Sequence, residues 1–250
     1  MDLYLKEKTA VVTGASQGLG RAIAKELALE GVHVLAIARN KTLLDSLQKE
    51  ITAAGGTPPT LLLQDFVAPD GPEKIATAAL AIFHHVDILV NNAGRSRPLD
   101  IIGPEDEWQQ AMTLDFDRHR QLTQQLLPQF IQRKQGSILN ITSTYELRAI
   151  NASAVAKASI TVWSKQLAGQ LGHYGITVNC LQPGLIDTAN IRRVFTPEAR
   201  LDFAQREIPL GDFGEPQDIA NMAAFLVSPR ARYTTGSVVA VDGGLRHYAF

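Results

Sequence analysis

Short apolar runs alternate along the chain with longer segments whose apolar residues recur at helical spacing. The predicted strands are 9–14, 32–38, 60–65, 87–94, 136–142, 176–184 and 237–244. The predicted helices are 19–31, 42–56, 72–84, 104–133 and 152–172. Several of these strands are apolar at consecutive positions, which indicates a sheet that is covered on both faces. The pattern therefore predicts an α/β fold: a Rossmann-type, doubly wound parallel sheet in three layers.

The composition narrows the class of protein. The chain has 250 residues, 45% of them hydrophobic, and a net charge of -1. This size, without any linker or low-complexity segment, predicts a single dinucleotide-binding domain over residues 1–250. The balanced charge gives no basic surface for nucleic acid. No apolar stretch reaches membrane-spanning length, so we expect a cytoplasmic protein with no membrane partner.

A glycine-rich stretch, TGASQGLG (13–20), follows the first predicted strand and opens the first helix. Gly14, Gly18 and Gly20 allow a tight turn, close backbone approach to a ligand and packing of the helix on the sheet. The amino terminus of the helix then faces a pyrophosphate. A tight turn without a ligand would read the same way, but the strand–turn–helix context favours dinucleotide binding.

The spacing of these glycines resembles the TGxxxGxG loop of the short-chain dehydrogenase/reductase family. Further motifs match in order: NNAG (91–94), LQDF (63–66), NITS (140–143), QPG (182–184) and VDGG (241–244). The resemblance implies hydride transfer between a nicotinamide nucleotide and a carbonyl or alcohol. The cofactor-binding residues that it implies are Gly14, Ser16, Gln17, Gly18, Leu19, Gly20, Arg39, Asp65, Phe66, Asn91, Ala93, Gly94, Lys157, Pro183, Gly184 and Thr188.

The end of the second strand bears on which nucleotide is bound. A carboxylate there would hydrogen-bond the ribose 2′-hydroxyl of NAD(H) and repel a 2′-phosphate. Ala38 and then Arg39 occupy this place, and a guanidinium suits a phosphate. NADP(H) is therefore favoured. NAD(H) stays possible, because Gln17 stands where NADP-dependent members often carry a second basic residue, and Arg39 could be a solvated surface arginine.

The segment that resembles the family's active site departs from it. The family uses a serine, a tyrosine and a lysine four residues after the tyrosine. Ser143 and Lys157 match the serine and the lysine, but Ser153 stands four residues before Lys157. A serine hydroxyl is much less acidic than a phenol, whose pKa is about 10, and it has a shorter reach. Direct acid catalysis by Ser153 is therefore not expected.

Two other residues are candidates for proton delivery. Tyr145 lies two residues after Ser143 and could bring its hydroxyl near Lys157, although it could equally pack on neighbouring apolar surface. Asp115 stands where the family has an asparagine. It could accept protons through Lys157, or it could be an acid on the outer face of a helix.

Three functions remain open. The first is an NADP(H)-dependent oxidoreductase acting on a small carbonyl or alcohol with modified proton delivery, with a substrate lid over 189–216. The second is a nucleotide-binding protein with little or no turnover, acting as a sensor or regulatory subunit. The third is an enzyme of this fold with other chemistry, such as elimination or dehalogenation. Apolar residues on the helices at 104–133 and 152–172, including Leu122, Leu126, Ile160 and Trp163, predict a homo-oligomer, specifically a tetramer.

Overall fold

The structure, a computed structural model, describes residues 1–143 and 149–246. In that part of the chain, one seven-stranded sheet has the order β3-β2-β1-β4-β5-β6-β7, and every neighbouring pair is parallel. The strands are β1 (Thr9–Thr13), β2 (His33–Ala38), β3 (Thr60–Leu63), β4 (Ile88–Asn91), β5 (Gly136–Ile141), β6 (Ile176–Pro183) and β7 (Val238–Val241). The predicted doubly wound Rossmann-type sheet is confirmed.

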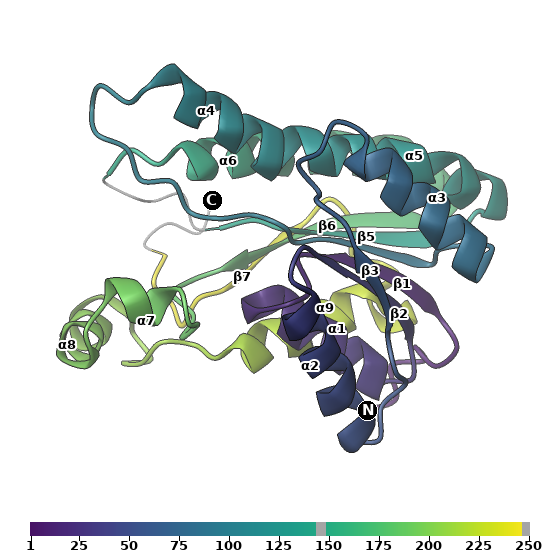
Figure 1. Ribbon diagram of the computed structural model, residues 1–250, viewed down its shortest axis with the longest axis horizontal. Helices are drawn as coiled ribbons and strands as arrows, with labels where there is room; N and C mark the ends of the chain where they lie inside the picture. The colour runs from purple at the N-terminus through teal and green to yellow at the C-terminus, as the bar shows by residue number, and fades with distance from the viewer. Residues whose placement is uncertain (144–148, 247–250) are drawn as a thin grey trace.

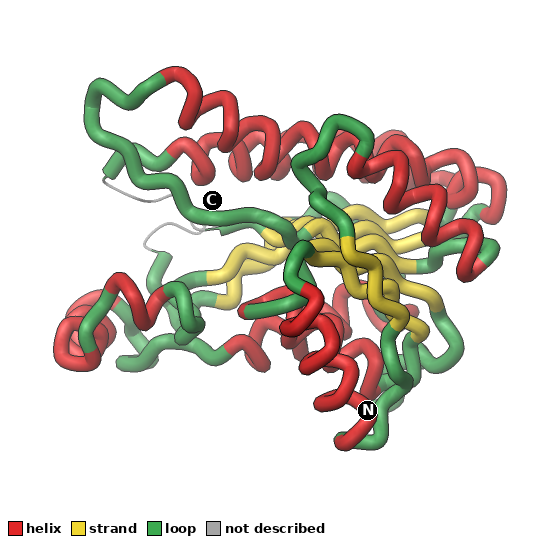
Figure 2. Tube along the Cα trace, in the orientation of Figure 1, coloured by secondary structure: helices red, strands yellow, loops and turns green. Residues whose placement is uncertain are grey.

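Helices cover both faces of the sheet and make three layers (Figures 1 and 2). The helices are α1 (Gly18–Leu29), α2 (Lys41–Ala53), α3 (Gly71–Phe83), α4 (Glu105–Met112), α5 (Arg118–Arg133), α6 (Ala152–Leu171), α7 (Ile191–Val194), α8 (Pro197–Glu207) and α9 (Pro216–Val227). Two 3₁₀ turns, Gly172–Tyr174 and Pro229–Ala231, follow α6 and α9. Helices α1, α2 and α9 bury one apolar core against the sheet, and α3, α5 and α6 bury the other.

Two helical segments differ from the sequence prediction. The single helix expected over 104–133 is interrupted by a π-helical turn at Thr113–Asp117, which joins α4 to α5. Helix α9 was not predicted. It begins with Pro216 and a capping box between Glu215 and Asp218, and it buries a small-residue face against α1. Those capping residues were the available signal for α9.

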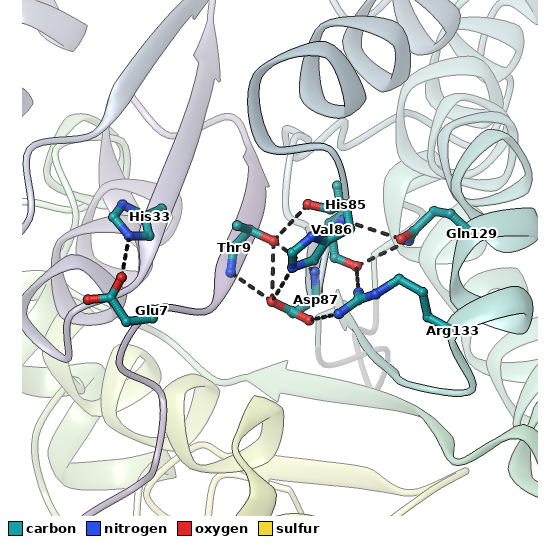
Figure 3. Close-up of polar contacts among 8 residues, drawn as sticks. All are labelled: Glu7, Thr9, His33, His85, Val86, Asp87, Gln129 and Arg133. Atoms are coloured by element: carbon teal, nitrogen blue, oxygen red, sulfur yellow. Dashed lines mark hydrogen bonds and ion pairs between the residues drawn. The ribbon is translucent and has the colours of Figure 1, made fainter.

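A buried acid ties the amino ends of the strands together (Figure 3). Asp87 accepts a hydrogen bond from the backbone N–H of Thr9 at 3.0 Å and from Arg133 at 2.9 Å. Gln129 of α5 also bonds both the N–H and the carbonyl of Val86. This network joins β1, β4 and α5 at the edge opposite the one where the predicted motifs end, and it leaves the carboxyl edge for ligands.

The expected interface residues are largely internal. Leu122, Leu126 and Ile160 are fully buried in the chain's own core, so they supply no face for a partner. Trp163 is partly buried and lies edge-on to Phe116, with 6.2 Å between the ring centres. Exposed apolar residues remain elsewhere on α6, and the homo-oligomer stays a prediction. Within the described residues, none of the helices combines the length and apolar character needed to cross a membrane.

Candidate active site

The glycine-rich loop lies at the carboxyl edge of the sheet, between β1 and α1. Gly14 and Gly18 adopt φ values of +67° and +55°, a region that favours glycine. A Cβ on Gly20 would collide with the Asn92 side chain and the Gly14 carbonyl. Asn92 holds this arrangement by donating to the carbonyl of Thr13 at 2.9 Å. The sequence analysis missed Asn92, although it lies within the NNAG motif.

The amino terminus of α1 suits an anionic group. Gln17, at its N-cap, makes no side-chain capping bond, and the first turn contains no acid. Ser16 is buried and Leu19 packs against the core. No described side chain caps the amino terminus of α1. The backbone N–H groups of the first turn and the helix dipole together favour a phosphate. The loop therefore fits the pyrophosphate of a dinucleotide.

The predicted adenosine residues flank β2 and β3. Arg39 is exposed directly after β2, and its side chain makes no hydrogen bond or ion pair with any described residue. Asp65 accepts a hydrogen bond from the backbone N–H of Val67 at 3.0 Å. Phe66 is buried and its ring lies 4.9 Å from the ring of His119. Arg39 thus has the freedom to pair with a ligand, whereas Phe66 serves packing.

The residues of the NNAG motif divide between structure and site. Asn91 turns into the core, where its amide donates to Asn140 at 2.8 Å and to Thr123 at 3.0 Å. The backbone N–H of Ala93 donates to the Thr13 hydroxyl at 3.0 Å. Asn91 therefore cross-links the strands and helices beneath the site, and Ala93 is fixed against β1.

His119 is a second residue that the sequence analysis missed. Its Nε2 lies 2.7 Å from the carbonyl oxygen of Ala93, to which it donates in the neutral ring. Burial is the main cause that lowers the pKa of His119 to about 4, and the nearby charge of Lys157 acts in the same direction. The ring is therefore neutral at physiological pH and holds the carbonyl of the motif in place.

Lys157, Asp115 and Gly94 come together beside this motif. The Lys157 ammonium donates to the carbonyl of Thr142 at 3.4 Å. A Cβ on Gly94 would collide with Asp115 Oδ1 and lie 3.5 Å from Lys157 Nζ. The absence of a side chain at Gly94 thus leaves room for both charged groups. The two side chains do not form a direct ion pair, but each acts on the charge of the other.

Asp115 lies in the π-helical turn and is fully buried. Neither carboxylate oxygen has a hydrogen bond of normal geometry with the described residues. Burial raises the pKa of the Asp115 carboxyl, and the opposing effects of Lys157 and Ser153 are smaller. Burial also lowers the pKa of Lys157, and Asp115 partly offsets this change. Of the two interpretations of Asp115 that the sequence left open, the acid on the outer face of a helix is wrong.

The two serines have different surroundings. Ser153 is buried, and its hydroxyl donates to the carbonyl of Arg95 at 2.6 Å. Ser143 is partly buried after the end of β5, where its carbonyl accepts from Gln182 at 3.0 Å. The Ser143 side chain makes no hydrogen bond with the described residues. Tyr145 lies outside the described residues.

The loop after β6 closes the other side of the site. A Cβ on Gly184, the residue after Pro183, would collide with the backbone of Asp242 after β7. Thr188 lies across from the glycine loop, with its methyl group 3.8 Å from a Cβ built on Gly18. Because these contacts bring the loop to the glycine turn, Thr188 is well placed to approach a nucleotide.

The segment predicted as a lid, 189–216, contains α7 and α8 and lies beside β7 (Figure 1). Asp187 pairs with Arg192 at 2.8 Å and also with Arg200. Three phenylalanines, Phe195, Phe203 and Phe213, meet edge-on with ring centres 5.8 to 6.1 Å apart. The segment therefore has a small core of its own, and the lid remains a prediction.

Comparison with known proteins gives the family. A family model described as enoyl-(acyl carrier protein) reductase matches residues 14–246. The 3-oxoacyl-[acyl-carrier-protein] reductase FabG of Thermotoga maritima is 32% identical, with 97% of this chain and 99% of the relative covered. The 3beta-hydroxysteroid dehydrogenase 1 of Eggerthella lenta is 34% identical, with 98% and 95% covered.

Solved structures of other proteins have the same fold over nearly the whole length of this chain. L-sorbose reductase from Gluconobacter frateurii, in complex with NADPH and L-sorbose, superimposes with a TM-score of 0.93 at 30% identity and covers 99% of this chain and 100% of that one. A 7α-hydroxysteroid dehydrogenase in complex with NADH gives 0.91 at 33% identity, with 97% and 96% covered. These relatives are oxidoreductases of the same fold.

Proposed function

The chain belongs to the classical short-chain dehydrogenase/reductase family, and we propose that it is an NADP(H)-dependent oxidoreductase that interconverts a small carbonyl and an alcohol with modified proton delivery. One observation carries the proposal: the glycine loop, Gly94 and Lys157 lie together at the carboxyl edge of the sheet. This edge is where parallel α/β sheets bind ligands. The bound nicotinamide would supply or accept the hydride.

Arg39 supports the choice of NADP(H). It is exposed after β2, it is not engaged with any described residue, and Ala38 offers no competing carboxylate. The related structures include complexes with NADPH and with NADH, so membership of the family does not determine which of the two nucleotides is bound. We expect tighter binding of NADPH than of NADH in calorimetric titrations. Equal affinities, or no change in Arg39→Ala, would refute the choice.

The proton must come from a group other than Ser153. Its hydroxyl is committed to the carbonyl of Arg95 and is too weakly acidic to act at neutral pH. In this proposal the Ser143 hydroxyl binds the substrate oxygen, and the proton comes from the Tyr145 hydroxyl or from a water molecule, either of them polarised by Lys157. In the water route, the relay draws its proton from the Asp115 carboxyl. General acid–base catalysis typically contributes about 100- to 10,000-fold, so the route matters to the rate.

Single substitutions separate the two routes. NADPH oxidation is followed with a panel of ketones and aldehydes for the wild type, Tyr145→Phe, Asp115→Asn and Ser153→Ala. A large loss of kcat in Tyr145→Phe with unchanged NADPH affinity identifies the phenol, and a large loss in Asp115→Asn identifies the carboxyl. Ser153→Ala is expected to retain most activity, and Lys157→Ala to lose most of it, partly through weaker cofactor binding.

A second candidate function is nucleotide binding with little or no turnover. The engaged Ser153 hydroxyl favours it, because the family's tyrosine has no replacement at that position. NADPH binding without turnover of any carbonyl or alcohol in the panel would establish this alternative and reject the oxidoreductase. Elimination or dehalogenation has no such observation in its favour.

A further inference from the structure

A cavity of about 350 Å³ opens beside the catalytic residues. Its lining comes from the loop between β4 and α4 and from the start of α4, namely Arg95, Ser96, Arg97, Pro98, Leu99, Asp100, Ile102, Pro104 and Glu107. The cavity is next to the proposed reaction centre, because the carbonyl of Arg95 accepts the Ser153 hydroxyl and its backbone N–H faces Asp115. A small substrate that occupies the cavity would therefore lie against Arg95, the lining residue whose backbone approaches Ser153 and Asp115.

The loop that carries these residues is well anchored. Leu99 donates its N–H to the carbonyl of Ile150 at 2.9 Å, and Ala152 donates to the carbonyl of Arg97 at 3.0 Å. The Asn151 amide donates to the Ser96 hydroxyl at 2.8 Å. The cavity wall is thus tied to the amino terminus of α6, the helix that carries Lys157.

Two guanidinium groups line this cavity. Arg97 is 7% exposed and pairs with Glu107 at 2.8 Å, but its buried Nε has no hydrogen-bond partner among the described residues. Arg95 is exposed and forms no hydrogen bond or ion pair through its side chain with that part of the chain. A buried N–H without a partner is unfavourable, and a ligand oxygen would satisfy it.

The charges in the cavity point to an acid with one carboxylate. Glu107 is already engaged by Arg97, so Arg95 is the lining arginine without an ion pair among the described residues. Asp100 is a second, exposed acid of the lining, so the two arginines and the two acids sum to no net charge, which disfavours a doubly charged phosphate. Leu99 and Ile102 add apolar wall for the rest of the molecule. A guanidinium binds a carboxylate through two parallel N–H groups, which also fixes its orientation.

We infer that Arg95 and Arg97 form a carboxylate-binding subsite, and that the substrate is a small oxo acid, or the corresponding hydroxy acid, with an apolar body. This inference rests on the proposed function, since it names the substrate of the same site. The carboxylate lies toward the loop, and the carbonyl that is reduced lies toward Ser143 and Lys157.

Matched oxo acids and their methyl esters test the inference. The wild type is expected to favour the acid over its ester by about tenfold or more in kcat/KM, the range of a charge-assisted hydrogen bond. Arg95→Gln is expected to raise KM for the acid by a similar factor and to remove most of the preference for the acid over its ester. Arg232→Gln, an exposed arginine that does not line the cavity, is the matched control.

The outcomes distinguish a failure of the carboxylate-binding subsite from a failure of the proposed oxidoreductase activity. Turnover of esters and acids at equal rates, or indifference to Arg95→Gln, overturns the subsite and leaves the oxidoreductase standing. If neither class is turned over, calorimetry of the oxo acid with the NADP⁺-saturated protein decides. Binding that Arg95→Gln weakens tenfold then supports the subsite without catalysis, and absence of binding overturns it.

Discussion

Replacing His119 with glutamine is expected to remove a pH-dependent part of the protein's stability. The imidazole is 2% exposed, and its Nε2 contacts the Ala93 carbonyl at 2.7 Å. Burial lowers its pKa from 6.5 to about 4. A glutamine amide can donate to the same carbonyl but does not titrate, so the substitution keeps the contact and removes the charge change.

The direction and the size of this pH effect on the free energy of unfolding follow from the difference in pKa between the folded and unfolded states. Between about pH 6.5 and pH 4 the unfolded chain binds a proton at this histidine that the folded protein does not. Stability is therefore fully present above this window and falls as the pH falls through it. One pKa unit corresponds to about 1.4 kcal/mol. The whole window amounts to about 3 kcal/mol, of which about 2 kcal/mol is lost by about pH 5.

Urea unfolding measures this loss at about pH 7.5 and about pH 5, at fixed protein concentration, since assembly would otherwise change the midpoint. The wild type is expected to lose about 2 kcal/mol more than His119→Gln between the two pH values. His33→Gln controls for the loss of a histidine as such, because that side chain is 44% exposed. Equal pH dependence in the wild type and His119→Gln would refute a neutral, buried imidazole.

Three further predictions concern stability, the cofactor loop and assembly. Asp87→Ala should lower the unfolding free energy by about 2–4 kcal/mol in urea titrations, because it removes a buried acceptor from Arg133, from the Thr9 backbone N–H and from the Thr9 hydroxyl. A change under about 0.5 kcal/mol, the range of ordinary surface substitutions, would contradict the network. Gly20→Ala should weaken NADPH binding by at least about tenfold, about 1.4 kcal/mol, through collision with the glycine loop. Gly169→Ala in α6, which meets open space, should bind normally, and equal binding by both variants would contradict the reasoning. Light scattering should give a homo-oligomer. If α6 forms the interface, Val162→Glu should dissociate it, because Val162 is 62% exposed on that helix. A monomeric wild type would reject the prediction.

The fold was predictable because its signals are local. Continuous apolar runs such as 9–14 and 136–142 can be buried only in a covered sheet, and the glycine spacing marks the turn after the first strand. Helix α9 was overlooked although its buried face combines three alanines with Ile219, Leu226 and Val227. The clearest sequence signal for this helix is at its start, in Glu215, Pro216 and Asp218.

The supporting residues of the site were not predictable in the same way. Asn92 and His119 act on backbone carbonyls of segments far away in sequence, so their partners are set by the strand order. Asn91 lies beside Asn92 in the motif, yet adjacent strand residues point to opposite faces, and Asn91 enters the core. The motif located the site, while the alternation of the strand decided which asparagine faces it.

The surroundings of Asp115 and of Ser153 can be interpreted only when the two residues are considered together. As a position in a long predicted helix, Asp115 is an ordinary solvated acid. The π-helical turn instead buries it beside Gly94, in the surroundings of Lys157 and Ser153. Burial raises the pKa of this carboxyl, so it holds a proton more readily than an exposed aspartate does, and it is a far stronger acid than a serine hydroxyl. Ser153 and Asp115, the two positions where the sequence was expected to depart from the family's pattern, therefore lie close together. In the proposed mechanism, Asp115 would be an acid near the lysine that the family's phenol otherwise accompanies.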